Sequence, residues 1–320
     1  MLALGGKSIA AQTTNDYENL LPVGLSICTE SAIVGPKIVG GSEIIEHSWW
    51  WLAQLRRYGS FICGSSILSD RWVLTAAHCC ESASTGYSVV IGAHASNSED
   101  HVYTIEQRIM HPNYGDSNGI NNDFCLLKTA EPMDLSNNTN ANIACLPNAD
   151  EHATPNADNC YVAGWGALSS GGGSPAFAQS AGVTIYSEAE CRNQSSYGST
   201  QIEFDTEFCA GDINGGTDSC QGDSGGPLVC IVNNMPYLYG VVSWGIGCAS
   251  RGYPGIYAKV SSAIEWIIEN TNGDGNDYTT EEFSTTSTSS SSTTTATTTT
   301  ASGDGTGEST IIYMITIIIQ

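Results

Sequence analysis

Short runs rich in β-branched and aromatic residues recur through the middle of the chain, and Gly, Pro, Asn and Ser separate them. Runs of this length and composition predict β-strands. They cover residues 49–55, 61–68, 72–76, 87–91, 161–165, 227–232 and 238–244. The pattern therefore predicts an all-β domain.

One helix is expected where this domain ends. Val260, Ile264 and Ile267 recur at helical spacing, and Ile268 extends the same face. Ser262 and Glu265 have the spacing of a capping box, in which each side chain bonds the other's backbone. We expect a C-terminal helix that docks on the domain.

The composition changes abruptly after Asn270. Residues 284–302 are almost entirely Ser and Thr, which offer too little apolar surface to offset the entropy of ordering. This composition is typical of an O-glycosylated stalk, and we expect it to be disordered. The chain divides into a leading segment (1–37), a folded domain (38–270) and a stalk with a short apolar end (271–320).

The two ends bear on localisation. Residues 311–320 are apolar but too few for a membrane span of about 20 residues. They fit a lipid-anchor signal with Ser302-Gly303 as its site, a truncated span or a plain hydrophobic end. The early apolar cluster, Leu2-Ala3-Leu4, is shorter than the roughly 7 to 15 residues of a signal peptide.

The chain has twelve cysteines, an even number, with no Cys-x-x-Cys pair and no Cys/His cluster at zinc-ligand spacing. Such usage indicates disulfides and an oxidising compartment, hence a secreted protein. We attribute the lack of an export signal to an incomplete N-terminus or a missed exon; a protein that is not secreted is the alternative. Asn137 and Asn193 each begin a glycosylation sequon.

The net charge of −23, with a pI near 4.2, argues against nucleic acid or an anionic membrane as a partner. Membrane attachment is expected only through the C-terminal anchor signal, if that interpretation holds.

Candidate chemistry lies in three motifs. Ser224 lies within Gly222-Asp223-Ser224-Gly225-Gly226-Pro227, where glycines let a substrate carbonyl approach the backbone amides. His78 follows the apolar run 72–74, and Asp123 opens another apolar run. A lone histidine or aspartate there would more often be structural. The order His, Asp, Ser, each in its own motif, indicates an activated serine nucleophile.

These motifs resemble those of the chymotrypsin-like serine proteases, over Ile38 to about Asn270. The resemblance implies two packed six-stranded antiparallel β-barrels with a C-terminal α-helix, acting as a monomer without a cofactor. It also implies that Ser224 attacks the substrate, His78 takes its proton, and Asp123 holds the imidazole. The amides of Gly222 and Ser224 would form the oxyanion hole. Protein or peptide substrates and protein protease inhibitors are the implied partners.

The same resemblance implies specificity. Asp218, six residues before Ser224, matches the base of a pocket that binds arginine or lysine; a plain surface acid is the alternative. The pocket walls match as well. They are Ser243, Trp244, Gly245 and Gly255.

Zymogen activation is implied by Lys37-Ile38-Val39-Gly40-Gly41. Cleavage after Lys37 would free the amino group of Ile38 to bind the carboxylate of Asp223, which makes residues 1–37 a pro-segment. A bridge from Cys28 to Cys145 would keep that segment attached.

The resemblance proposes further disulfides, Cys63–Cys79, Cys160–Cys230, Cys191–Cys209 and Cys220–Cys248. Cys80 and Cys125 are left to join each other, close to His78 and Asp123. The loop 92–102 is shorter than the calcium-binding loop of pancreatic members and has Ala93 where they have a liganding acid, so no metal is expected. Phe124 and Cys125 depart from the family's smaller residues after the acid.

Two functions of different classes remain after this comparison. The first is a trypsin-like endopeptidase made as a zymogen. The second is a catalytically silent protein that keeps the protease fold for binding or adhesion on a glycosylated stalk. Retention of the catalytic, activation and pocket residues favours the first.

Overall fold

The computed structural model describes residues 41–82, 85–99, 101–116, 119–135, 140–149, 151–156, 159–169, 171–198, 202–216 and 218–271. These residues belong to one compact unit. The stalk, Lys37, Ile38, Cys28 and Asn137 lie outside them.

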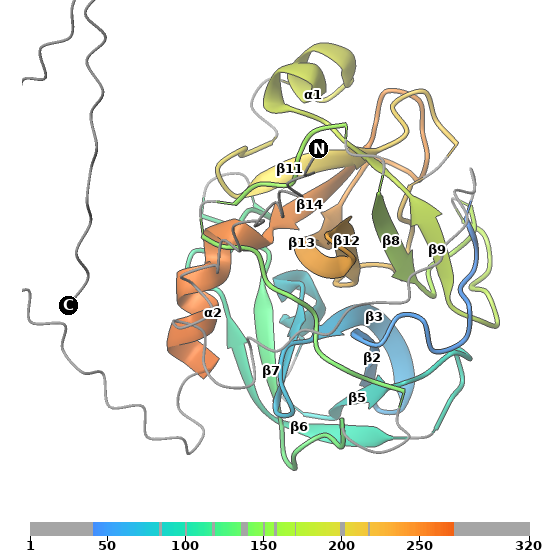
Figure 1. The fold of residues 1–320 in the computed structure, drawn as a ribbon, viewed down its shortest axis with the longest axis vertical. Coiled ribbons are helices and arrows are strands. Elements are labelled where there is room, and N and C mark those ends of the chain that lie inside the picture. The colour runs from blue at the N-terminus through green and yellow to red at the C-terminus, as the bar shows by residue number, and fades with distance from the viewer. Residues whose placement is uncertain are drawn as a thin grey trace, which may run out of the picture. The chain divides into compact units, whose positions relative to one another are not determined.

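Six strands form a closed antiparallel barrel in the first half of the domain (Figure 1). They are β2 (Leu52–Arg57), β3 (Ser60–Ile67), β4 (Trp72–Thr75), β5 (Tyr87–Ile91), β6 (Val102–Met110) and β7 (Cys125–Thr129). The order is β2-β3-β4-β7-β6-β5, and the barrel closes because β2 pairs with both β3 and β5. A closed barrel leaves no unpaired edge strand.

The second half is an eight-stranded antiparallel sheet in the order β1-β9-β8-β12-β13-β14-β11-β10. Its strands are β1 (Ser42–Glu43), β8 (Cys160–Gly164), β9 (Gln179–Gly182), β10 (Thr184–Ile185), β11 (Glu207–Gly211), β12 (Pro227–Val232), β13 (Met235–Trp244) and β14 (Gly255–Lys259). The mostly β fold expected from the sequence is confirmed. The second sheet differs in detail from a closed six-stranded barrel, because the two-residue strands β1 and β10 extend its edges.

The two sheets share one apolar core. Leu55, Leu74 and Leu127 of the first barrel are fully buried in the same cluster as Val229 and Val241 of the second sheet. Burial of such side chains provides about 25 cal/mol for each Å² of apolar surface removed from water. This common core fixes the two sheets against each other, so loops from both can contribute to one site.

The apolar runs located most of the strands that they predicted. The runs 87–91 and 227–232 coincide with β5 and β12, while the first predicted strand, 49–55, begins three residues before β2. The pattern missed β6, β9, β11 and β14. Most of β6 is exposed or half-buried, so it carries no apolar run, and its pairing with β5 and β7 holds it in the sheet.

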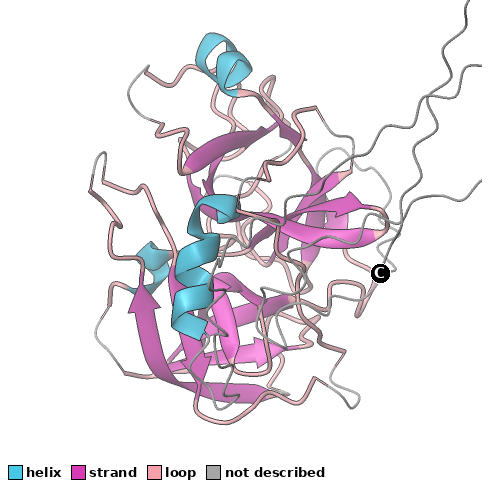
Figure 2. Cartoon of the chain, turned by 60° about the vertical axis from the view of Figure 1, so that its left-hand side comes forward, coloured by secondary structure: helices cyan, strands magenta, loops and turns pink. Residues whose placement is uncertain are grey.

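The C-terminal helix α2 (Ile264–Thr271) follows the 3₁₀ turn η3 (Val260–Ala263) and buries Ile264 and Ile267 in the shared core (Figure 2). The predicted capping box is wrong. Ser262 already lies inside η3, and its hydroxyl donates to the carbonyl of Lys259 at 2.7 Å.

A second helix, α1 (Glu188–Gln194), was not predicted, although a capping box marks it. The amide of Glu190 donates to Ser187 Oγ, and its carboxylate accepts from the amide of Ser187. Asn193 is exposed on this helix. Among the described residues, no helix has the length and apolar character to cross a membrane.

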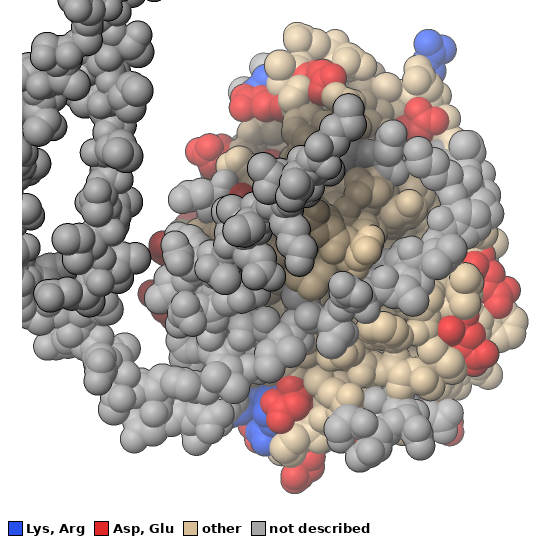
Figure 3. Space-filling model, viewed as in Figure 1, with Lys and Arg blue, Asp and Glu red and all other residues tan. Residues whose placement is uncertain are grey.

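Acidic side chains outnumber basic ones on the face drawn in Figure 3, in line with the net charge of the chain.

Candidate active site

Strand pairing brings His78 and Asp123 together. Thr75 at the end of β4 pairs with Cys125 at the start of β7. His78 comes three residues after Thr75, in the 3₁₀ turn η2 (Ala77–Cys80), and Asp123 comes two residues before Cys125. Neighbouring antiparallel strands run in opposite directions, so the end of one lies beside the start of the other. Two residues 45 positions apart are thereby placed in contact.

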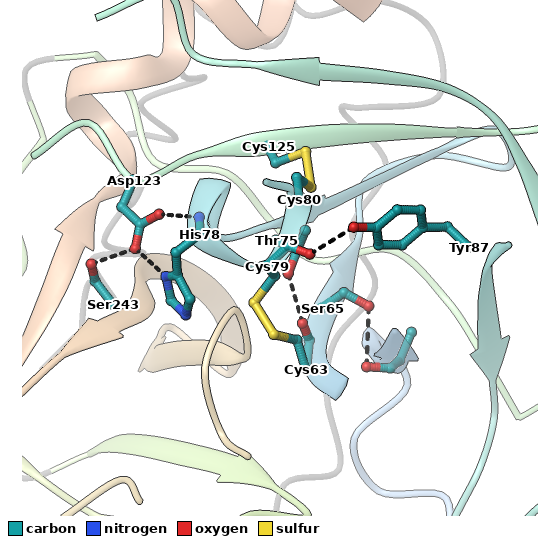
Figure 4. Close-up of a disulfide and its surroundings, with 12 residues drawn as sticks. Cys63, Ser65, Thr75, His78, Cys79, Cys80, Tyr87, Asp123, Cys125 and Ser243 are labelled. Carbon is teal, nitrogen blue, oxygen red and sulfur yellow. Dashed lines mark hydrogen bonds and ion pairs between the residues drawn. A yellow bond between two sulfur atoms is a disulfide. The ribbon is translucent and has the colours of Figure 1, made fainter. Parts of the chain in front are cut away.

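The carboxylate of Asp123 makes two hydrogen bonds with His78 (Figure 4). Oδ2 lies 2.7 Å from the ring Nδ1, and Oδ1 accepts the backbone amide of His78 at 2.9 Å. The second bond fixes the backbone at the start of the turn, and the first holds the ring against the carboxylate. The arrangement favours the tautomer with its proton on Nδ1, which leaves Nε2 free to act as a base.

Ser243 gives Asp123 a third hydrogen bond, from its hydroxyl to Oδ2 at 2.6 Å. Asp123 is fully buried, and three donors satisfy the carboxylate that burial would otherwise destabilise. The sequence placed Ser243 in the wall of the specificity pocket. Its hydroxyl points at the carboxylate of Asp123, a contact between residues 120 positions apart that no local sequence motif predicts.

Opposing effects act on the pKa of His78. Burial lowers it, but the hydrogen bond and charge of Asp123, with a smaller contribution from Glu81, raise it above the usual value. The environment therefore favours the imidazolium that forms when the ring accepts a proton.

Ser224 lies in a turn that is anchored to both sheets. Its carbonyl accepts the amide of Gly64 on β3 at 2.8 Å, and the next amide, of Gly225, donates to Val242 on β13 at 2.8 Å. Its hydroxyl makes no hydrogen bond to a described residue. Catalytic hydrogen bonds of this kind are often long without substrate, so the free hydroxyl is compatible with attack.

The amides of Gly222 and Ser224 donate to no described residue. The two groups that the sequence assigned to the oxyanion hole therefore remain available for a ligand. Gly222 has a φ of +99°, a conformation that few residues other than glycine adopt.

Asp223 points away from the serine into the second sheet. Its carboxylate accepts the amide of Gly166 at 2.8 Å and that of Cys220 at 2.9 Å. Burial raises the pKa of this carboxyl to about 6, because no described cation offsets the loss of water. A Cβ on Gly164 or Gly166 would collide with the carboxylate, so glycine is needed at both positions.

Asp218 is a second half-buried acid, six residues before Ser224 in the chain. It accepts the amides of Ser219 at 2.8 Å and Ala249 at 3.3 Å, and burial raises its pKa to about 7. A Cβ on Gly255 would lie 2.6 Å from Oδ1, so a larger residue there would close the space above the carboxylate. Asp218 and Asp223 both line a cavity of about 290 Å³ that also includes Gly41.

Five disulfides are present in the described residues, and they are those expected. They join Cys63 to Cys79, Cys80 to Cys125, Cys160 to Cys230, Cys191 to Cys209 and Cys220 to Cys248. Cys145 is also disulfide-bonded. Its expected partner, Cys28, lies outside the described residues.

Potential metal ligands converge at Cys63, His78 and Cys79. The two cysteines are joined to each other, so neither offers a thiolate, and the histidine is engaged by Asp123. This group therefore does not have the chemistry of a metal site.

Residues 38–267 match the family model described as Trypsin. The chain belongs to the trypsin family. The domain is thus a chymotrypsin-like serine protease, for which the family implies protein substrates and protease inhibitors as partners. Family membership and the five disulfides indicate an extracellular protein.

The first prediction concerns Gly225, which lies close to Thr75 and to the backbone of Gly64. Gly225 has a φ of +75°, and a Cβ there would collide with Thr75 Oγ1 and lie 2.7 Å from the carbonyl of Gly64. We expect Gly225→Ala to lower the free energy of unfolding by about 2 to 5 kcal/mol, the sum of backbone strain and overpacking. The substitution should also abolish hydrolysis, since the turn that carries Ser224 must move.

Gly59→Ala is the matched control for Gly225→Ala. Its φ is +78°, and a Cβ there would meet nothing within 4 Å. Only the strain of about 1 to 2 kcal/mol should appear in its denaturant unfolding curve, with activity unchanged. Equal losses in the two variants would show that the contact with Thr75 and Gly64 is unimportant.

The Cys80–Cys125 disulfide generates the second prediction. It ties η2, which carries His78, to the first residue of β7. Replacing both cysteines by alanine should lower the free energy of unfolding by about 4 kcal/mol from loop entropy, and the Cys191–Cys209 pair by about 3 kcal/mol. Only the first variant should lower kcat, because the second bridge is remote from the His78–Asp123 pair. Equal effects on kcat would contradict a positioning role.

Proposed function

We propose that this protein is a serine endopeptidase that cleaves after arginine or lysine, made as a zymogen that cleavage between Lys37 and Ile38 activates. The observation that carries the proposal is a pair of half-buried carboxylates, Asp218 and Asp223, that line one cavity without a described cation between them. Each is suited to receive one positive charge.

The catalytic steps follow from the geometry of His78. Ser224 Oγ attacks the substrate carbonyl while Nε2 of His78 takes the hydroxyl proton, and Asp123 stabilises the resulting imidazolium. The amides of Gly222 and Ser224 bind the oxyanion. His78 then gives its proton to the leaving amine, which leaves an acyl-enzyme at Ser224. Water hydrolyses this ester by the same steps, with His78 again as the base.

Specificity would come from Asp218. An arginine or lysine side chain that enters the recess past Gly255 brings a cation to a carboxylate that burial has made reluctant to ionise. Its arrival lowers the pKa of the carboxyl and forms a charge-assisted hydrogen bond.

Activation would come from Asp223. Gly41 lines the cavity that Asp223 occupies, and Ile38 precedes Gly41 by three residues. Three extended residues span roughly 10 Å, so the new ammonium of Ile38 can enter the same cavity. The ion pair would fix the turn from Cys220 to Ser224, and hence the amides of the oxyanion hole.

The alternative, a silent binding or adhesion protein, is less well supported. Some members of the trypsin family are inactive, and the family match alone does not exclude one. Here the bonds of Asp123 to both His78 and Ser243 preserve a complete base, which a binding scaffold would not need.

Covalent labelling tests the proposed activity. We expect an organophosphonate with a basic side chain to label Ser224 with one equivalent after cleavage at Lys37, and to label the intact zymogen far more slowly. Ser224→Ala is the control that should remain unlabelled. A cleaved protein that resists the reagent would favour the binding scaffold.

The pKa of Asp218 generates a pH prediction. An acid with a raised pKa is neutral below that value, so KM for arginyl substrates should rise as the pH falls through about 7. Because the rise in KM below about pH 7 comes from protonation of Asp218, KM for a substrate with a neutral side chain should not rise in the same way. An identical pH dependence of KM for the two substrates would exclude Asp218 as the group that binds the cation.

Substitution of Asp218 tests the same recess at constant pH. Removing one partner of a buried charge pair costs about 3 to 5 kcal/mol, so Asp218→Ser should reduce kcat/KM for arginyl esters by roughly 10²- to 10⁴-fold. Hydrolysis of an ester with a neutral side chain should change little. Unchanged cleavage of arginyl esters would mean that another group forms the base of the pocket.

A further inference from the structure

Glu207 is a buried carboxylate that the catalytic scheme does not use. It is the first residue of β11, and only 2% of its surface is exposed. Its Oε1 accepts the indole N–H of Trp244 at 2.8 Å, and its Oε2 accepts the amide of Glu203 at 2.8 Å. Both oxygens are therefore engaged.

Burial of the ionised Glu207 carboxylate is unfavourable in free energy. Burial raises its pKa, and the hydrogen bond from Trp244 only partly offsets that effect. The charges that act on it, Asp123 and Glu203, have the same sign, and no described lysine or arginine pairs with it. An apolar side chain of similar length would avoid the cost, so the acceptor itself must serve a purpose.

The purpose is indicated by where Trp244 lies. Its neighbour Ser243 bonds Asp123, and its other neighbour, Gly245, lies against Gly255 in the wall of the Asp218 recess. The half-buried indole is therefore placed between the catalytic acid and the recess. A peptide with one side chain in the recess and its carbonyl at Ser224 must lay adjacent residues along this segment.

Two contacts fix the indole. One is the edge contact with Tyr197, whose ring centroid lies 5.3 Å away and whose hydroxyl donates to the carbonyl of Pro254. The other is the bond to Glu207, which reaches across β14, since Glu207 pairs with Ala258 and Trp244 with Ile256 on that strand. The first restrains the ring plane, and the second fixes the direction of its N–H.

We propose that Glu207 is a positioning residue that holds Trp244 as the wall of a subsite for the substrate residues next to the one in the Asp218 recess. The inference rests on the proposed function. It implies a preference for extended peptides over substrates that fill the recess alone.

The test compares two arginine substrates in the activated full-length protein. One is a simple arginine ester, and the other is a tetrapeptide amide that ends in arginine. Glu207→Met removes the acceptor and keeps the length of the side chain. We expect it to raise KM for the tetrapeptide about tenfold, the effect of one lost hydrogen bond to a charged group, and to change KM for the ester much less.

Glu207→Gln should recover only part of the tetrapeptide KM, because its single acceptor oxygen can serve either the indole N–H or the amide of Glu203, and its NH2 group then faces the other donor. Glu203→Gln is the control for charge alone, and it should leave both substrates unaffected, since Glu203 bonds Glu207 through its backbone amide and carbonyl and not through its side chain. Glu207→Leu provides a second apolar variant if the methionine variant does not fold. Titration of active sites corrects each rate for the folded fraction.

Equal losses on both substrates, or no change in the tetrapeptide KM of the methionine variant, would each overturn the inference. Failure of the proposed function is distinguishable, because the native protein would then hydrolyse neither substrate.

Discussion

The pairing of β4 with β7 is the constraint on which the site depends. It sets Thr75 beside Cys125, and every catalytic distance in the first barrel follows from that register. A shift of one residue would turn Asp123 to the opposite face of the strand. The Cys80–Cys125 disulfide links the same two segments and prevents such a slip. The geometry of base and acid is therefore set by backbone hydrogen bonds and one covalent bridge before their own bond forms.

The serine comes from the second sheet, and close backbone approach connects it to the first. Gly64 on β3 donates to the carbonyl of Ser224, and a Cβ on Gly64 would lie 2.7 Å from the Cα of Gly226. Side chains at these positions would force the sheets apart. With glycine at these positions, the two backbones are in direct contact with no side chains between them. This contact fixes Ser224 relative to His78 without a bond between their side chains.

Three aspartates, one buried and two half-buried, show how surroundings assign different roles to one side chain. Asp123 receives three hydrogen bonds, from two groups of His78 and from Ser243, which together satisfy its charge. Asp218 and Asp223 receive backbone amides only, and burial raises the pKa of each. A buried acid in that condition gains more from an arriving cation than an exposed one, since the cation offsets the lost hydration. A positive charge on the substrate, or on a freed amino terminus, would thereby stabilise one conformation of the turn that carries Ser224.

How much the sequence could predict depends on whether a constraint is local. The apolar runs act within a few residues, and they predicted an all-β domain. The placement of His78 beside Asp123 was implied by the resemblance of three short motifs to those of the serine proteases. The bonds of Ser243 to Asp123 and of Glu207 to Trp244 depend on the register of several strands, and no local pattern contains that register.

The two Ser-x-x-Glu patterns make the same point. Ser187 has an extended backbone, with a φ of −61° and a ψ of 157°, so its side chain can turn back to the amide of Glu190. Ser262 has the same partner spacing, but the chain leaves β14 directly into the turn that starts at Val260. Its backbone is already helical there, so the hydroxyl reaches back to Lys259 instead of forward. The pattern is necessary for the cap, and the conformation of the preceding residues decides whether it forms.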